Sequence, residues 1–289
     1  MIEEIVNKII QFADDTNMWK IILTEADGES LQKDLDNIQK WSEKWLLKFN
    51  SKKCVVLHLG NKNIKCEYSM VSTDGVRKTL QSVNEERDLG VIICDDLKVA
   101  RQCAVATQKA MKILGLIKRN FKKLDEATFK VLYCSYVRPH LEYCIQAWSP
   151  YLEKDIKMIE EVQERATKII PGFKFLTYEQ RLKKLDLSTL QQRRKRGDLI
   201  EAYKIITGKE KIDPGILCTP SHTKNLRGNR YKLFKKTCNL QLRESFFSQR
   251  VVNDWNNLPD TVVSAPTVNS FKNRLDKFLK NERWNNSEG

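Results

Sequence analysis

The stretch QFADDTNMW, residues 11–19, places two adjacent carboxylates, Asp14 and Asp15, between two short apolar runs. The first run covers residues 5–13 and the second covers residues 16–23, and both are rich in large and β-branched side chains. Such runs are typical of strands, and a separation of two residues is typical of a tight hairpin. The sequence therefore predicts a β-hairpin with the acidic pair at its tip and both acidic side chains in solvent.

The residues that follow predict that this hairpin belongs to an α+β region with antiparallel strands. Apolar residues recur at helical spacing over residues 30–49, with Ser30 as the expected N-cap and Gly28 as the expected break before it. Strand-like segments follow at residues 54–60, 64–71 and 88–94, with turns expected at Asn61, Asp74–Gly75 and Glu85–Glu86.

From about residue 97 the hydrophobic period becomes helical. Helices are expected over residues 97–121, 125–137, 152–170, 177–184, 189–207, 245–257 and 268–280. Pro139 is one of the residues expected to break the helical pattern, and the polar stretch 209–230 is expected to form a long loop. Trp148 and Trp255 lie in apolar helical contexts, so both are expected in the core.

Charge is distributed unevenly along the 289 residues, which carry 51 basic and 37 acidic side chains and a net charge of +14. Residues 1–94 hold 13 basic and 15 acidic side chains, whereas residues 95–289 hold 38 and 22. This basic body indicates an acidic partner, of which nucleic acid is the commonest and a membrane surface is the alternative. No apolar run reaches the length of a membrane-spanning helix, so no membrane insertion is expected.

The cysteines and the first residues indicate the compartment. None of the eight cysteines forms a CxxC motif, and Glu3 and Glu4 stand where a signal peptide would be apolar. We therefore expect an intracellular protein with reduced thiols, in the nucleus or the cytoplasm. Cys134, His140 and Cys144 could hold zinc, but their spacing fits no common zinc pattern, so buried structural cysteines are favoured.

Two carboxylates at a hairpin tip can share a divalent cation. Mg²⁺ prefers oxygen ligands and usually takes one or two protein carboxylates together with substrate phosphates. Because Asp is also common in turns, the dipeptide taken alone favours a polar turn over a metal site. The sequence segments around the hairpin favour the metal site instead.

The Phe-Ala-Asp-Asp motif, preceded by an apolar strand, resembles the metal-binding motif of reverse transcriptases. KFNSKKCVVLHLG resembles the next palm motif, with Asn50 and Lys53 at the family's Asn-x-x-Lys positions. ERDLGVIIC resembles the primer-grip turn, with Leu89 and Gly90 at its centre. The later segments LYCSYVRPHLEYCIQAWSP, EVQERATKII, YEQRLKKLDLSTLQQRRKRGDLIEAYKI and FFSQRVVNDWNNLP are similar to the C-terminal half of non-LTR retrotransposon polymerases of the jockey-like and chicken-repeat type. The resemblance covers nearly the whole chain, and the order of its motifs makes it specific.

The resemblance implies a partial reverse transcriptase palm over residues 1–94, a helical thumb-like region over 95–175 and a basic helical extension over 176–289. In the intact family enzyme, Asp14 and Asp15 would be catalytic residues that bind Mg²⁺ or Mn²⁺, and Lys53 matches a position proposed to protonate the leaving pyrophosphate. Family members carry a further catalytic Asp and a fingers region upstream, for which the sequence leaves no room before the hairpin. We therefore expect a truncated polymerase that is inactive alone and exposes an apolar hairpin edge to a missing N-terminal polymerase segment.

In this family the helices after the palm bind the RNA and DNA of the primer–template. The expected contacts are the turn of Leu89 and Gly90, the end of the first long helix at Lys118, Arg119, Lys122 and Lys123, and the basic run Arg193, Arg194, Lys195 and Arg196. Lys and Arg bind phosphates without reading the base sequence. Affinity is expected to fall steeply with salt, and replacing the run 193–196 is expected to flatten this salt dependence and leave the fold intact.

A third basic run holds Arg227, Arg230, Lys232, Lys235 and Lys236, and Tyr231 beside it could stack on unpaired bases. Tyr203 and Phe234 lie close to the basic runs as well, but both are expected mainly in the core. For any single run a solvated helix face is the alternative, and the run 193–196 also resembles a nuclear-localisation cluster.

The sequence leaves three hypotheses for the function. The first is a truncated RNA-directed DNA polymerase, and the second is a non-enzymatic nucleic-acid-binding module derived from such an element. The third is a helical interaction protein whose acidic pair is accidental. The third ranks last, because it requires the ordered set of family-like segments to arise by chance.

Overall fold

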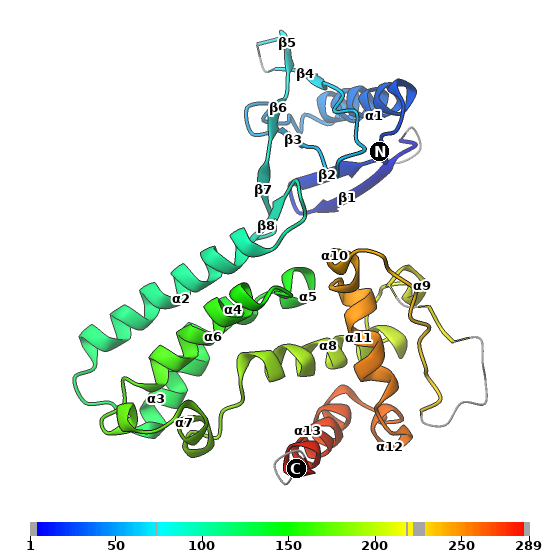
Figure 1. Cartoon of the computed structure of the whole chain (residues 1–289). Helices are drawn as coiled ribbons and strands as arrows, with labels where there is room; N and C mark the ends of the chain where they lie inside the picture. The colour runs from blue at the N-terminus through cyan, green and yellow to red at the C-terminus, as the bar shows by residue number, and fades with distance from the viewer. Residues whose placement is uncertain (1–4, 73, 218, 222–228, 286–289) are drawn as a thin grey trace. The chain divides into compact units, whose positions relative to one another are not determined.

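The computed structural model describes residues 5–72, 74–217, 219–221 and 229–285, and the chain divides into two units, Met1–Lys98 and Val99–Gly289 (Figure 1). The first unit combines one helix with short strands and the second is helical, which confirms the predicted α+β class. The first predicted domain boundary, after residue 94, falls at the end of the last strand of the first unit.

The strands of the first unit pair two by two. In chain order its elements are β1 (Lys8–Phe12), β2 (Asp15–Trp19), α1 (Glu25–Lys44), β3 (Val55–Leu57), β4 (Ser69–Val71), β5 (Arg77–Thr79), β6 (Gln81–Val83), β7 (Glu85–Asp88) and β8 (Val91–Cys94). β1–β2, β4–β5 and β7–β8 are antiparallel, but β3 and β6 are parallel, so the expectation of antiparallel strands is wrong for that pair. The connection through β4 and β5 is long enough to return the chain in the same direction.

Helix α1 begins at Glu25, earlier than the predicted start near Ser30. Thr24 and Asp27 form a capping box, in which the Asp27 backbone N–H donates to Thr24 Oγ1 at 3.3 Å and the Thr24 backbone N–H donates to Asp27 Oδ2 at 3.0 Å. The hydrogen bond from the Thr24 side chain is the largest cause that lowers the pKa of the Asp27 carboxyl. Gly28 was expected to end the preceding strand, and this prediction is wrong, because β2 ends at Trp19 and Gly28 lies inside α1.

Gly28 lies inside α1 at a point where the helix closely approaches Cys66. A Cβ added at Gly28 would lie 2.5 Å from Cys66 Sγ and 3.0 Å from Cys66 Cβ. Glycine costs about 1 kcal/mol relative to alanine in an exposed helix interior. The close approach of Cys66 therefore explains why a poor helix former occupies this position.

Substituting Gly28→Ala is expected to lower the free energy of unfolding by about 1–3 kcal/mol, because the overlap with Cys66 outweighs the gain in helix propensity. Urea denaturation measures the change. The matched control is Gly115→Ala in the second unit, where no atom lies within 4 Å of the added Cβ, and this variant should gain stability. Adding Cys66→Ala to Gly28→Ala should restore part of the loss, and an absence of any recovery would contradict the steric explanation.

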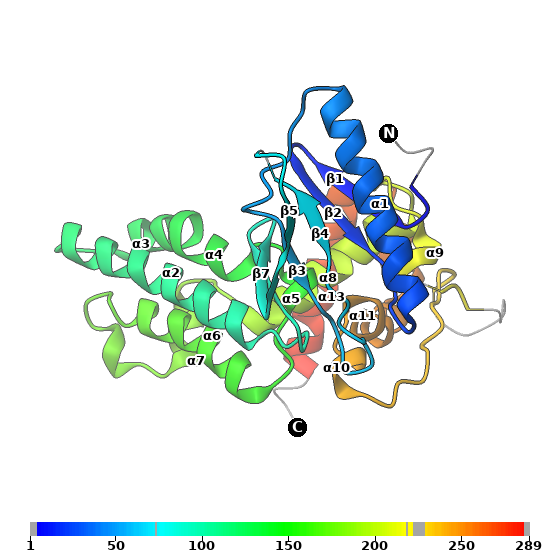
Figure 2. The same cartoon turned by 90° about the horizontal axis from the view of Figure 1, so that it is seen from above.

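Polar side chains of α1 bind the edge of strand β4. Gln32 Nε2 donates to the Ser69 carbonyl at 2.9 Å, and the Ser69 N–H donates back to Gln32 Oε1 at 2.9 Å. Gln39 makes the same reciprocal pair with Val71, again at 2.9 Å in both directions. These amides satisfy backbone groups that an edge strand would otherwise expose. Figure 2 shows α1 alongside the hairpin of β1 and β2, where the Asn7 N–H donates to Asp34 Oδ2 at 2.7 Å.

The helices of the second unit match the predicted long helices within a few residues. The elements are α2 (Ala100–Asn120), α3 (Glu126–Leu132), the π-helix η1 (Tyr133–Val137), α4 (Arg138–Glu142), α5 (Ile145–Trp148), α6 (Glu153–Thr167), the 3₁₀-helix η2 (Phe173–Phe175), α7 (Tyr178–Lys184), α8 (Leu190–Ile206), α9 (Pro214–Leu217), α10 (Gln241–Glu244), α11 (Phe247–Asn256), α12 (Asp260–Val263) and α13 (Val268–Asn285). Within the described residues, no helix has the length and apolar character needed to cross a membrane.

Pro139 was expected to break the helical pattern, and this prediction is wrong. The chain passes from α3 through η1 into α4 without leaving helical conformation, and the Arg138 N–H donates to the Tyr133 carbonyl. Pro139 occupies the first turn of α4. A missing N–H is tolerated at this position, and π-turns commonly absorb a local change in the helical hydrogen-bond pattern.

The core of the second unit's C-terminal part lies where α8, α11 and α13 meet. The Tyr203 and Phe271 rings stack at a centroid separation of 4.2 Å, and the Tyr203 hydroxyl donates to the Ala265 carbonyl. Tyr203, Trp148 and Trp255 are buried, as predicted. Phe234 was expected in the core as well, but its side chain is 50% exposed.

Candidate nucleic-acid interface

The predicted hairpin forms, with a two-residue turn shifted by one position. Phe12 pairs with Asp15, so the turn contains Ala13 and Asp14, and Asp15 is the first residue of β2. Ala13 has φ 53°, a left-handed conformation that suits the tight turns of β-hairpins. Asp14 and Asp15 are both exposed, so two carboxylates are presented to solvent from a hydrogen-bonded pair of strands.

One face of the hairpin is apolar and exposed. The register places Ile10, Phe12 and Trp19 on the same face as Asp15, and these three large side chains are exposed. Within the described residues, β1 and β2 pair only with each other. Three exposed apolar side chains therefore lie on the hairpin face that also carries Asp15.

The acidic pair can supply two oxygen ligands to a divalent cation. Mg²⁺ often uses only one or two carboxylates and takes its other ligands from water and phosphate, so Asp14 and Asp15 fit that ion chemically. In the part of the chain that the structure describes, no group of three or more His, Cys, Asp or Glu side chains could hold a metal. Cys134, His140 and Cys144, the set considered for zinc, therefore form no such group.

Lys53 and the turn at Leu89 lie in separate loops of the first unit. Lys53 is exposed, and its N–H donates to the Asn50 carbonyl at 2.9 Å, so the Asn-x-x-Lys segment forms a turn. No described hydrogen bond or ion pair joins Lys53 to Asp14 or Asp15. Asp88 pairs with Val91, and Leu89 and Gly90 have φ 44° and 88°, as a type I′ hairpin turn requires. The turn expected at Glu85–Glu86 is wrong, because both residues belong to β7.

Helix α2 carries an exposed basic face. Its 21 residues contain five basic side chains and no carboxylate. Lys109, Lys112, Lys118 and Arg119 are exposed on it, and Lys122 and Lys123 are exposed just beyond its end. Among the described residues, no carboxylate lies within ion-pair distance of these six cations. Figures 1 and 2 both show α2 beside α4 and α6, against which its apolar side packs.

The run 193–196 on α8 is engaged inside the second unit. Arg193 makes a two-point ion pair with Glu142 of α4, with Nη2 2.9 Å from Oε2. Lys195 Nζ lies 2.8 Å from Asp254 of α11. Arg196 makes a two-point pair with Asp276 of α13, at 2.6 and 2.9 Å. Arg194 is only 5% exposed, and burial lowers the pKa of its guanidinium. The run therefore connects α8 to three neighbouring helices.

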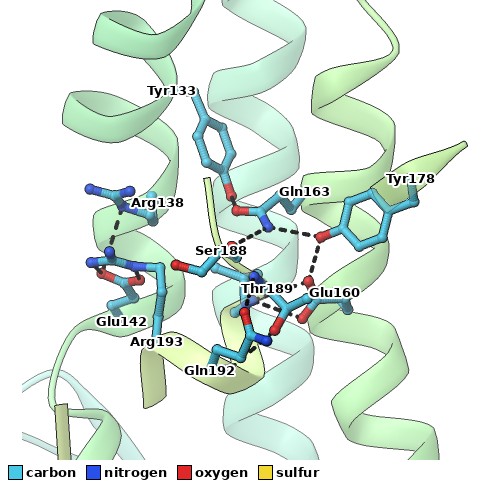
Figure 3. Close-up of polar contacts among 11 residues, drawn as sticks. Tyr133, Arg138, Glu142, Glu160, Gln163, Tyr178, Ser188, Thr189, Gln192 and Arg193 are labelled. Atoms are coloured by element: carbon cyan, nitrogen blue, oxygen red, sulfur yellow. Dashed lines mark hydrogen bonds and ion pairs between the residues drawn. The ribbon is translucent and has the colours of Figure 1, made fainter. Parts of the chain in front are cut away.

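A buried polar network fixes the start of α8 (Figure 3). The Tyr133 hydroxyl donates to Gln163 Oε1 at 2.8 Å, and Gln163 Nε2 donates to the Tyr178 hydroxyl at 2.8 Å and to the Ser188 carbonyl at 2.9 Å. Tyr178 donates in turn to Glu160, which accepts the backbone N–H of Leu190 at 3.0 Å. Burial is the main cause that raises the pKa of the Tyr178 hydroxyl. The network holds α8 in the orientation that brings its basic run to Glu142.

The third basic run is divided between paired and unpaired cations. Arg230 makes a two-point pair with Asp260, whereas Lys235 and Lys236 are exposed. Arg227 lies outside the described residues. Sequence reasoning missed the carboxylates that neutralise the basic runs, because Glu142 and Asp276 lie 51 and 80 residues from their partners. The only signal of such pairing was the 22 acidic residues of the basic body.

No protein-family model matches the sequence, and no curated protein or solved structure shows significant similarity to it.

Proposed function

We propose that the chain binds nucleic acid through the exposed basic face of α2, as part of an RNA-directed DNA polymerase of the non-LTR retrotransposon type. The observation that carries this proposal is the set of six exposed cations at positions 109–123 with no carboxylate beside them. The ordered motifs of the sequence support the polymerase assignment. The primer–template, an RNA–DNA hybrid, is the proposed partner.

The physical case for α2 rests on the rigidity of its basic face. Cys103, Ala106, Ala110, Leu114 and Ile117 are buried on the opposite side of the helix. Four of the six cations, Lys109, Lys112, Lys118 and Arg119, lie on the helix and therefore keep fixed positions relative to one another, and Lys122 and Lys123 follow just beyond its end. Contacts of this kind give affinity and orientation without reading the base sequence. Lys118 and Arg119 also complement the helix dipole, but that effect is confined to the last turn and does not explain Lys109 or Lys112.

In the proposed polymerase the acidic hairpin supplies the metal ligands. Asp14 and Asp15 would hold Mg²⁺ or Mn²⁺ together with substrate phosphates, and the bound ion would neutralise charge on the transferring phosphoryl group. Lys53 is proposed to donate a proton to the leaving pyrophosphate, and the turn of Leu89 and Gly90 to contact the primer.

A non-enzymatic nucleic-acid-binding module is the second candidate. The observation that favours it is that the described residues gather only two carboxylates at the hairpin. Both candidate functions require nucleic-acid binding by the exposed cations of α2, so binding to an RNA–DNA hybrid tests them together. A primer-extension assay distinguishes them, because only the polymerase would extend a primer.

The test is equilibrium binding of the purified chain to an RNA–DNA hybrid over a range of salt concentrations. Wild-type affinity is expected to fall steeply with salt and to be similar for unrelated base sequences. Replacing Lys112, Lys118, Arg119, Lys122 and Lys123 together by Gln is expected to lower affinity at least about a hundredfold at low salt. Each lost phosphate contact should reduce the slope of log K against log salt concentration by about 0.9.

The matched control removes five exposed lysines elsewhere on the second unit, Lys154, Lys157, Lys183, Lys211 and Lys277. Both variants lose the same net charge, so a purely non-local electrostatic effect would weaken binding equally in the two. Equal affinities for the two variants, or a wild-type affinity that does not change with salt, would overturn the proposed role of α2.

A further inference from the structure

The segment from Asn229 to Cys238 is held along α11 by a series of hydrogen bonds. Asn229 Nδ2 donates to the carbonyls of Trp255 and Leu258, each at 3.0 Å, and Trp255 Nε1 donates to the Tyr231 carbonyl at 2.7 Å. These bonds fix the beginning of the segment at the C-terminal end of α11 and leave its backbone little freedom.

Leu233 is the strongest anchor of the segment. Its N–H donates to Asn256 Oδ1 at 2.9 Å, and Asn256 Nδ2 donates back to its carbonyl at 2.8 Å. Its side chain is buried in the cluster around Trp255. On the other side, the Phe234 N–H donates to the Thr219 carbonyl at 2.7 Å, so the chain here is bonded from both edges.

A second tether lies further along at Cys238, whose Sγ contacts Gln249 Oε1 of α11 at 3.8 Å. Asn256 and Gln249 are about 10 Å apart along the helix axis. The chain between these tethers therefore runs antiparallel to α11. Phe234, Lys235, Lys236 and Thr237 all lie in this interval, and all four are exposed.

The exposed groups of this segment have the chemistry of a single-strand binding surface. Phe234 is 50% exposed although its backbone is fixed by hydrogen bonds, and the exposed Lys235 and Lys236 follow it directly in the chain. Residues 229–243 contain five basic side chains and no acidic one. Among the described residues, no carboxylate lies within ion-pair distance of Lys235, Lys236 or Arg243.

We propose that this segment binds single-stranded nucleic acid, with an unpaired base stacked on Phe234 and the adjacent phosphates held by Lys235 and Lys236. Aromatic stacking needs an exposed base face, which a duplex hides and a single strand offers, and lysines beside the ring bind the strand's backbone. Tyr231, also exposed, provides a second ring three residues before Phe234. This inference rests on the proposed function only in that the partner is nucleic acid. Here the ligand is a single strand bound by residues 234–236, whereas α2 is proposed to bind an RNA–DNA duplex.

The test compares binding of a single-stranded oligonucleotide containing 2-aminopurine with binding of an RNA–DNA hybrid. Substituting Phe234→Leu is expected to reduce single-strand affinity by about tenfold and to abolish the stacking quench of 2-aminopurine, with hybrid affinity unchanged. Replacing Lys235 and Lys236 by Gln is expected to lower the single-strand salt slope by about 1.4. Since all three side chains are exposed, the thermal melts should match the wild type.

Phe175→Leu is the matched control, because Phe175 is 83% exposed and Lys174 lies 5.4 Å from its ring centroid. Equal single-strand affinity for Phe234→Leu, Phe175→Leu and wild type would overturn this inference. An acidic peptide that displaced the bound oligonucleotide as strongly as unlabelled oligonucleotide does would overturn the inference too. Such a result would show that binding depends on charge attraction alone and not on base stacking. A Phe234-dependent single-strand affinity combined with unchanged hybrid binding in the α2 variant would refute the α2 proposal and leave this one standing.

Discussion

Replacing Arg193, Arg194, Lys195 and Arg196 together by Gln is expected to destabilise the second unit by several kcal/mol and to lower its melting temperature by roughly 10–20 °C. The sequence alone predicted a flatter salt dependence of nucleic-acid binding with an intact fold. The structure gives three of these cations carboxylate partners on α4, α11 and α13 and buries the fourth, Arg194.

The four contributions differ in size because their exposure to water differs. Arg193 and Glu142 are each 26% exposed and make a two-point contact, so the loss of this pair should cost about 2–3 kcal/mol. The pairs of Lys195 and Arg196 are more exposed, and screening by water limits each to about 1 kcal/mol. Removing the buried Arg194 adds a packing loss, partly offset because its Nη1 has no described hydrogen-bond partner.

Circular dichroism during thermal melting measures this effect. A control that replaces Lys154, Lys157, Lys183 and Lys211 by Gln removes the same charge without breaking a described ion pair and should melt with the wild type. A double-mutant cycle between Arg193 and Glu142 should give a coupling energy above that of Lys195 and Asp254. If the quadruple variant melts like the wild type and loses hybrid binding, the interpretation made from sequence was correct and α8 is a nucleic-acid surface.

The sequence was sufficient to locate most long helices and the acidic hairpin, because their signals are local. Hydrophobic period and loop residues placed the helix that became α8 within one residue at each end. The same local reasoning identified Trp255 as a core residue. Local reasoning did not predict that Gly28 lies inside a helix. The residue that leaves no room for a side chain there, Cys66, is remote in sequence and gives no local signal.

Long-range pairing explains why the partners of the basic residues could not be predicted from the sequence. A run of four basic residues has the same appearance in sequence whether it faces phosphates or carboxylates. Only the fold brings Glu142 and Asp276 to the run. Only the fold shows that, among the described residues, the exposed cations at positions 109–123 have no carboxylate within ion-pair distance. Phe234 was predicted in the core, but it is the adjacent Leu233, paired with Asn256, that is buried, and the Phe234 ring is exposed.

The acidic hairpin supplies only part of what catalysis of DNA synthesis requires. In-line phosphoryl transfer depends on positioned phosphates and on metal ions that neutralise the developing charge. Asp14 and Asp15 contribute two carboxylates, and no third metal-ligating side chain is grouped with them in the described chain. The exposed apolar face formed by Ile10, Phe12 and Trp19 lies beside them and could pack against a further polymerase segment.

We therefore expect the chain alone to fail to extend a primer on an RNA template with Mg²⁺ and nucleotides, and to support extension when an N-terminal segment of a non-LTR polymerase is added in trans. In that mixture Asp14→Asn or Asp15→Asn should reduce extension about a thousandfold or more, because each removes a metal-binding charge and keeps the turn chemistry. Lys53→Ala should slow extension and leave hybrid binding unchanged.

Asp74→Asn is the matched control, since Asp74 is also an exposed turn carboxylate, paired with Lys78 at 2.6 Å. Extension that survives both hairpin substitutions would remove the acidic pair from catalysis, and extension by the unassisted chain, lost in Asp14→Asn, would show that its own residues complete the metal site.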